Sequence, residues 1–280
     1  MPSTVALGGH IDHMRCEGSV VGDAATDIEA LERSFARGLE SLWLAFQPIV
    51  RARDGGVFGW EALVRTSEPT LAQASAVVGA AETLERLLDL GRAVRAQAAM
   101  QIEKVKPNGR VFLNLDLREL YDPMLTAHDG PLLHLASNVV LEITERAVVE
   151  PSPMLYRRLA ELREAGYLIA LDDLGSGNAS LASLVHILPD IIKLDRVLVR
   201  DIGAAPVQQK LIRALAAFAR DCGCMVVGEG VETEEERDVL ASLGCDLLQG
   251  FLVGPPGRNM DESVAAHGGI TPPRAACELR

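Results

Sequence analysis

The chain has 280 residues, of which 48% are hydrophobic, and a formal net charge of −12 at pH 7. This length and hydrophobic content suffice for one large domain or two small ones. The negative charge argues against a nucleic-acid polymer as the main partner, because binding to phosphate chains calls for clustered Lys and Arg. A small anionic ligand is compatible with it if cations are supplied locally.

Residues 1–26 show no sustained periodicity and are expected to form a tail or linker, and residues 263–280 a C-terminal tail. We expect no signal peptide and no membrane segment, because a basic start and a run of ~20 apolar residues are both missing. The five cysteines show no CxxC spacing, which fits reduced thiols in a cytoplasmic protein. Cys222 and Cys224 could join a metal site or a redox pair, but incidental thiols near a helix end are favoured.

The pattern changes at Thr26, where Thr26 or Asp27 is predicted to cap a helix whose apolar residues recur at helical spacing. Short apolar runs then alternate with amphipathic ones. The runs expected to be strands are 44–50, 57–64, 111–115, 139–144, 168–171, 191–194, 225–228 and 246–249. The clearest helical patterns cover 80–105, 153–164, 206–222 and 234–243.

Eight strands, mostly followed by helices, predict an α/β fold, a (β/α)8 TIM-like barrel over residues 27–262. Only the first two strands are joined by a short turn, at residues 53–56, which favours an antiparallel first strand. A doubly wound open sheet is the alternative. It lacks the support of a G-x-G-x-x-G or Walker A signature.

A carboxylate stands inside the nearly apolar second strand, where residues 57–64 read VFGWEALV. Burying an unpaired charge is expensive, so Glu61 needs a proton, a cation or a metal as its partner. An ordinary salt bridge to Arg65 or another base would meet this need. A functional carboxylate would meet it equally well.

Polar side chains recur at the ends of the expected strands, and in a barrel those ends share the rim where active sites lie. A ring of at least five carboxylates repels itself, and Lys193 and Arg65 alone cannot neutralise it, whereas divalent cations can. The rim set comprises Glu61, Asn114, Glu142, Asp172, Asp173, Lys193, Asp195, Glu229 and Gln249.

The ligand chemistry narrows the metal. Oxygen ligands without His or thiolate suit Mg²⁺ or Mn²⁺, and none of the six histidines falls at these strand ends. The adjacent Asp172 and Asp173 can touch two ions, and two ions about 3.5–4 Å apart clamp the attacking and leaving oxygens of a phosphoryl displacement. The residues therefore favour a two-metal phosphoesterase. A single-metal enzyme of the enolase kind, with rim carboxylates and a lysine, is the alternative.

Eight short motifs, in order between about residues 44 and 256, together resemble the EAL-domain family of cyclic di-GMP phosphodiesterases. The resemblance implies a barrel with an antiparallel first strand and a homodimer. It also implies that Mg²⁺ or Mn²⁺ supports hydrolysis of one phosphodiester bond of cyclic di-GMP to linear pGpG, which lowers this second messenger in bacterial signalling. The motifs read FQPIV, EALVR, FLNLD, LEITE, DDLGSG, IIKLDR, GEGVET and QGFLVGPP.

The resemblance also assigns roles to residues. Arg65 resembles the residue that contacts a substrate phosphate in the family, and Glu145 resembles the residue that anchors the loop after Asp173. Gln47, Gln249 and Asn114 match positions whose side chains approach metal-bound water or the nucleotide in the family. Gln47 could instead satisfy backbone at a strand end, and Glu145 could be a solvated helix cap. The first metal's implied ligands are Glu61, Asn114, Glu142 and Asp172, and the second's are Asp172, Asp173 and Glu229.

Lys193 is often described in the family as the general base, and Glu61, Glu229 and Asp195 are counted as catalytic with it. A lysine beside carboxylates has a raised pKa and stays protonated, although two nearby cations act in the opposite direction. We therefore expect Lys193 to orient the nucleophilic water and to stabilise developing charge. Asp195, two residues on, would hold the lysine or the water, and a plain Lys–Asp pair is the alternative.

The sequence departs from the family beside the site. The loop that usually reads DDFGTGYSS is DDLGSGNAS here, so Leu174 and Asn178 replace aromatic residues, and Thr66 stands where a Trp is common. These changes remove packing area but no ligand. A catalytically weak cyclic di-GMP receptor acting through a regulatory protein partner is the alternative function. Because such members typically lose a ligand, we favour the enzyme.

Overall fold

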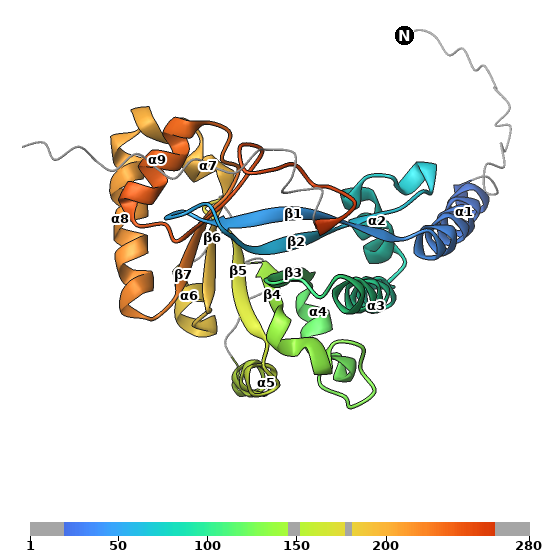
Figure 1. Ribbon diagram of the computed structural model, residues 1–280. Helices are drawn as coiled ribbons and strands as arrows, with labels where there is room; N and C mark the ends of the chain where they lie inside the picture. Colours follow the sequence, from blue (N-terminus) through green and yellow to red (C-terminus); the bar gives the residue numbers. More distant parts are fainter. Residues whose placement is uncertain (1–19, 145–151, 177–180, 261–280) are drawn as a thin grey trace, which may run out of the picture.

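The computed structural model describes residues 20–144, 152–176 and 181–260 (Figure 1). Within these ranges, eight strands pair in chain order and close into one barrel. The strands are β1 (Trp43–Arg51), β2 (Val57–Arg65), β3 (Arg110–Leu115), β4 (Val139–Thr144), β5 (Leu168–Leu174), β6 (Ile191–Leu194), β7 (Met225–Gly228) and β8 (Leu247–Gln249).

β1 runs antiparallel to both of its neighbours, β2 and β8, while the strands from β2 to β8 pair in parallel. The tight turn between β1 and β2 places Gly55 at φ 70°, and the Asp54 carboxylate accepts a hydrogen bond from the Gly56 N–H at 2.8 Å. Gly55 can adopt this left-handed conformation because it has no Cβ. The predicted TIM-like barrel with an antiparallel first strand is confirmed, and the open sheet is wrong.

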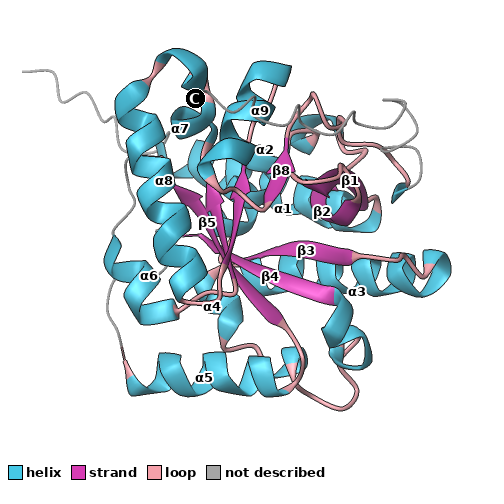
Figure 2. Cartoon of the chain, turned by 60° about the vertical axis from the view of Figure 1, so that its left-hand side comes forward, coloured by secondary structure: helices cyan, strands magenta, loops and turns pink. Residues whose placement is uncertain are grey.

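Helices surround the strands (Figures 1 and 2). Short 3-10 turns, η1 (Pro69–Leu71), η2 (Pro123–Leu125), η3 (Leu133–Asn138) and η5 (Ile202–Ala204), lie in the connections. The helices are α1 (Val20–Glu40), α2 (Ala74–Thr83), α3 (Leu87–Val105), α4 (Leu117–Leu120), α5 (Pro153–Glu164), α6 (Leu181–Ile187), α7 (Arg196–Val199), α8 (Pro206–Asp221) and α9 (Glu234–Leu243).

Two helix predictions were wrong. The first helix begins at Val20, before the cap predicted at Thr26 or Asp27. The single helix predicted over 80–105 is two helices, because Glu85 at φ 56° ends α2 in a left-handed conformation that a right-handed helix cannot continue. The Arg86 N–H bonds to the Ala81 carbonyl and the Glu85 N–H to the Glu82 carbonyl, which closes the end as in a Schellman motif.

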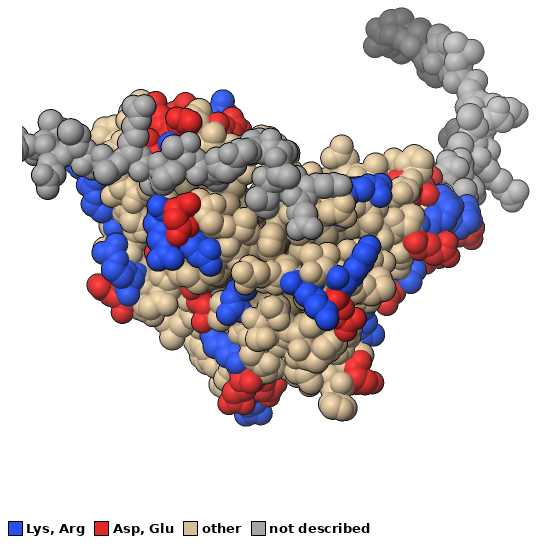
Figure 3. Space-filling model, viewed as in Figure 1, with Lys and Arg blue, Asp and Glu red and all other residues tan. Residues whose placement is uncertain are grey.

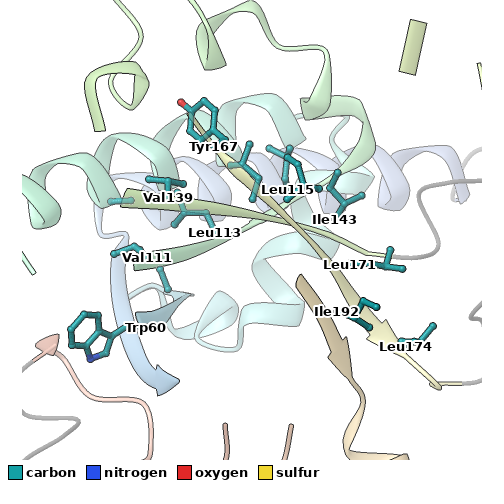
Figure 4. Packing of buried hydrophobic residues seen from close by; sticks show 14 of the residues in the cluster. Trp60, Val111, Leu113, Leu115, Val139, Ile143, Tyr167, Leu171, Leu174 and Ile192 are labelled. Carbon is teal, nitrogen blue, oxygen red and sulfur yellow. The ribbon is translucent and has the colours of Figure 1, made fainter. Parts of the chain in front are cut away.

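The strands are buried on both faces. Their outward side chains pack under the helices, as Figure 4 shows for Val111, Leu113, Val139 and Ile143. The inward side chains form a second cluster inside the barrel. Because side chains alternate along a strand, each strand serves both clusters. The inner cluster consists of Ile49, Phe112, Val140, Ala170, Ile191, Val227 and Leu247.

Cationic and anionic side chains are interspersed over the face seen in Figure 3. None of the described helices combines the length and apolarity needed to cross a membrane. The three cysteines in the described ranges, Cys222, Cys224 and Cys245, form no disulfide. Burial raises the pKa of the Cys224 and Cys245 thiols to about 12, so both stay protonated and unreactive at neutral pH.

Candidate functional site

The candidate site lies one layer above the apolar cluster inside the barrel. On most strands, the inward residue that follows the apolar one, two positions along, is polar. The alternation of side chains therefore places these polar groups in one ring. The successive inward pairs are Phe112 and Asn114, Val140 and Glu142, Ala170 and Asp172, Ile191 and Lys193, Val227 and Glu229, and Leu247 and Gln249.

Lys193 occupies the middle of this ring and is 1% exposed. Its ammonium Nζ lies 2.7 Å from Glu142 Oε1 and 2.7 Å from Glu229 Oε1. Asp172 Oδ1 is 3.0 Å away and Glu61 Oε2 is 3.6 Å away. Burial alone lowers the pKa of Lys193, but the four carboxylates together raise it well above its ordinary 10.5. Lys193 is therefore a fixed cation at neutral pH.

Burial has the opposite effect on the surrounding carboxylates, because it disfavours their charged form and so raises their pKa values. Burial raises the pKa of Glu142 well above its ordinary value, and the neighbouring Lys193 only partly offsets this. Burial likewise raises the pKa of Glu229 to about 8. The ring therefore carries more negative charge than one lysine can balance, and it retains protons in the absence of further cations.

Glu61 is held by amide side chains from two other strands, β3 and β8. Asn114 Nδ2 donates to Glu61 Oε1 at 3.2 Å, and Gln249 Nε2 donates to Glu61 Oε2 at 2.6 Å. Gln249 also donates to Gln47 Oε1 at 3.3 Å, and Gln47 Nε2 donates to the Gly254 carbonyl at 3.2 Å. Gln47 therefore both satisfies a backbone group and belongs to the site.

The twin aspartates gather on one side because β5 is irregular. Successive residues of a regular strand point to opposite faces. Here the β5–β6 register shifts between Leu171 and Leu174, and Asp173 has φ 61°. Such an irregularity can redirect a side chain. As a result, carboxylate oxygens of Asp172, Asp173 and Glu229 lie within 4.8 Å of one another.

These residues fit divalent cations. Within the described part of the chain, Glu142 Oε1 and Asp172 Oδ1 have only the shared Lys193 ammonium as a polar partner, and the buried Glu142 Oε2 accepts no hydrogen bond. Buried anionic oxygens without donors are costly unless a cation is close. The donor set contains carboxylate and amide oxygens and no sulfur or imidazole. Such oxygens are the ligands that Mg²⁺ and Mn²⁺ prefer.

A cavity of about 290 Å³ opens beside the ring. Besides predicted residues, it is lined by Arg196, Glu232 and the 62% exposed Phe251, which the sequence reasoning missed. Each lies within three positions of a predicted strand-end residue, so attention to the segments just past those ends would have found them. Gly230, at φ 68°, allows the chain to lie close to Arg196, because a Cβ at this position would lie 2.5 Å from the Arg196 Cβ.

Two predicted residues, Asp195 and Arg65, lie apart from the ring. Asp195 forms no ion pair with Lys193 within the described ranges, because β6 ends at Leu194 and the chain turns into α7. The Asp195 carboxylate caps α7 by accepting a hydrogen bond from the Val197 N–H at 2.7 Å. The residue also lines the cavity. Arg65 is half-buried and forms no salt bridge to Glu61 or to another acid of the described chain. Glu145 lies outside the described residues.

Comparison with protein families gives a match over residues 28–256 to the model described as EAL domain. Over 237 residues the chain is 33% identical to the cyclic di-GMP phosphodiesterase PdeR of Escherichia coli, covering 81% of this chain and 36% of that protein. It is 30% identical over 240 residues to the bifunctional diguanylate cyclase/cyclic di-GMP phosphodiesterase MucR of Pseudomonas aeruginosa, with 81% and 34% covered. The chain thus spans about a third of these relatives' lengths.

Solved structures agree with the barrel. The PaMucR phosphodiesterase in complex with c-di-GMP superposes with a TM-score of 0.70 at 28% identity, over 79% of this chain and 99% of that one. The Klebsiella pneumoniae BlrP1 manganese/cy-diGMP complex superposes with a TM-score of 0.68 at 30% identity, over 78% of this chain and 56% of that one.

Proposed function

Because the chain belongs to the EAL domain family, we propose that it hydrolyses one phosphodiester bond of cyclic di-GMP to give linear pGpG, with Mg²⁺ or Mn²⁺ bound. The observation that carries the proposal is the ring itself. Four carboxylates surround one buried lysine beside an open cavity. The carboxylates of Asp172, Asp173 and Glu229 are close enough to one another to share an ion. The names of PdeR and of the PaMucR complex point to the same substrate.

Two groups of residues would hold the metals. Glu61, Glu142 and Asn114 would share one ion with Asp172, and the carboxylates of this group all lie within 3.6 Å of Lys193 Nζ. Asp172, Asp173 and Glu229 would hold a second ion, since their carboxylate oxygens lie within 4.8 Å of one another. When bound, divalent cations activate water and neutralise charge on the reacting phosphoryl group.

Without bound metals, the four carboxylates raise the pKa of Lys193 well above its ordinary 10.5. We propose that Lys193 also keeps its proton when the metals are bound. As a buried cation it would orient the nucleophilic water and stabilise the charge that develops on the phosphate oxygens. Gln249 and Asn114 fix the two oxygens of Glu61, which determines how this carboxylate faces the site. The guanidinium of Arg65, at the end of β2, forms no ion pair with the described residues and suits a non-bridging phosphate oxygen.

Product analysis tests the proposal. The purified chain is incubated with cyclic di-GMP and Mn²⁺, and the nucleotides are separated by chromatography. We expect pGpG from the wild type and a rate lower by several orders of magnitude from Glu61→Ala, with nucleotide binding retained in part. Binding of cyclic di-GMP without any turnover would refute hydrolysis and favour the receptor function.

A further inference from the structure

Arg65 sits at the rim with little to hold its side chain. It is the last residue of β2 and is four positions after Glu61, so both side chains leave the strand on the same side. Its guanidinium Nη1 donates to the Val64 carbonyl at 2.8 Å. A guanidinium binds a phosphate well only when its fork is correctly oriented, so the position of the strand end matters for binding.

The segment directly after Arg65 is fastened to the last turn of α1 by an ion pair. Glu68 is 7% exposed, and the Arg37 guanidinium donates two hydrogen bonds to its carboxylate, from Nε to Oε2 at 2.8 Å and from Nη2 to Oε1 at 3.1 Å. Thr70 donates a third hydrogen bond to Oε1 at 2.9 Å. These bonds satisfy the carboxylate and lower the pKa of Glu68.

A second contact joins the same two elements. The buried Thr66 hydroxyl accepts the Glu68 N–H at 2.8 Å and lies 3.0 Å from the Ser41 hydroxyl. Ser41 donates its own proton to the Arg37 carbonyl at 2.8 Å, so Thr66 is the donor to Ser41. The hydroxyls therefore form a directed chain from the β2 end to the α1 backbone.

We infer that this rim latch, formed by Arg37, Ser41, Thr66 and Glu68, positions Arg65 for its phosphate contact. The inference rests on the proposed function. The latch holds the residue next to Arg65 in place, and β1 holds Arg65 itself, which pairs with Trp43 just after the end of α1. Arg37 and Glu68 are positioning residues that act on substrate binding through Arg65, and α1 becomes part of the binding apparatus.

Arg37→Ala tests the latch, because the Arg37 side chain is 55% exposed and its truncation leaves no cavity in the core. The matched control is Arg33→Ala on the same helix, where Arg33 forms only an exposed pair with Glu29 at 3.6 Å. KM and kcat are measured with Mn²⁺, and Kd for cyclic di-GMP is measured by calorimetry with a chelator. We expect Arg37→Ala to raise KM and Kd roughly 3–10-fold, as for one coupled contact, with kcat nearly unchanged. Arg33→Ala should match the wild type, and Arg37→Lys should recover part of the loss.

A double-mutant cycle separates positioning from general destabilisation. In the Arg65→Ala background, Arg37→Ala should cause no further rise in KM or Kd. An equal rise in both backgrounds, or unchanged constants in Arg37→Ala, overturns the inference. Ser41→Ala gives a second, smaller perturbation of the same latch if Arg37→Ala fails to fold. A wild type that neither binds nor cleaves cyclic di-GMP refutes the proposed function and the inference together, whereas an active wild type with insensitive variants refutes only the latch.

Discussion

Replacement of Lys193 by Met distinguishes a lysine that supplies charge from one that accepts a proton. Met keeps the length of the side chain but removes the ammonium that lies 2.7 Å from both Glu142 and Glu229. Loss of one preorganised donor of this kind lowers kcat by about 10²–10³, which corresponds to about 2.7–4 kcal/mol. The assay is the rate of pGpG formation at saturating substrate and Mn²⁺ as a function of pH.

The pH profile decides between the two roles. Without bound metals, the carboxylates raise the pKa of Lys193 well above 10.5. If this residue also stays charged with the metals bound, as we propose, it produces no acid limb over the neutral range. The limb should therefore persist in Lys193→Met at a reduced rate. If the acid limb disappears in this variant, Lys193 is the general base and the reasoning from its ionic surroundings is wrong.

Three further predictions concern the metals and the substrate. A chelator should abolish turnover, and Mg²⁺ or Mn²⁺ should restore it while Zn²⁺ should not, because the donors are oxygens; activity in a metal-free preparation would contradict the two-metal assignment. Because the pKa of Glu229 is raised from 4.5 to about 8, the metal-free fold holds a proton there at pH 7, so Mn²⁺ binding should release protons near pH 7. Calorimetry in buffers of different ionisation enthalpy measures the number of protons released. This number should fall above pH 8 and in Glu229→Gln. An unchanged number in Glu229→Gln would show that Glu229 is not the source of the proton. Arg65→Ala should raise KM with a smaller effect on kcat, and Arg65→Lys should recover only part of the loss, because an ammonium lacks the guanidinium fork; identical kinetics in both variants and the wild type would remove Arg65 from the site.

The barrel could be predicted from the sequence because strand periodicity and turn chemistry are local signals. Gly55 in the first turn marked the hairpin, and the polar residues that end apolar runs marked one rim. The break at Glu85 could not be predicted, because a Schellman end is usually marked by Gly and the sequence offers Glu there. The helical periodicity on either side is uninterrupted.

The site could be predicted in membership but not in contact pattern. The position of Lys193 inside a cage of four carboxylates depends on the register between strands, which no single strand encodes. Asp195 was expected to hold the lysine or the water because it is two residues from Lys193, and in the structure it forms no ion pair with the lysine within the described ranges. That expectation assumed that β6 continues, whereas the chain turns into α7 at this residue. Arg196, Glu232 and Phe251 lie beyond the strand ends, so a search confined to strands missed them.

The closing seam of the barrel has a consequence for folding. β1 joins β2 through a short local turn, but it joins β8 only after nearly the whole chain has been made, with Ile49 opposite Gln249. Long-range pairings of this kind form late, because the chain must lose conformational entropy before the stabilising contacts between distant residues can form. Gln249 is also the residue that bonds Glu61 and Gln47 across that seam. An unclosed intermediate therefore lacks an intact site, and recovery of activity during refolding should follow the closure of the barrel and lag behind the formation of the β1–β2 hairpin.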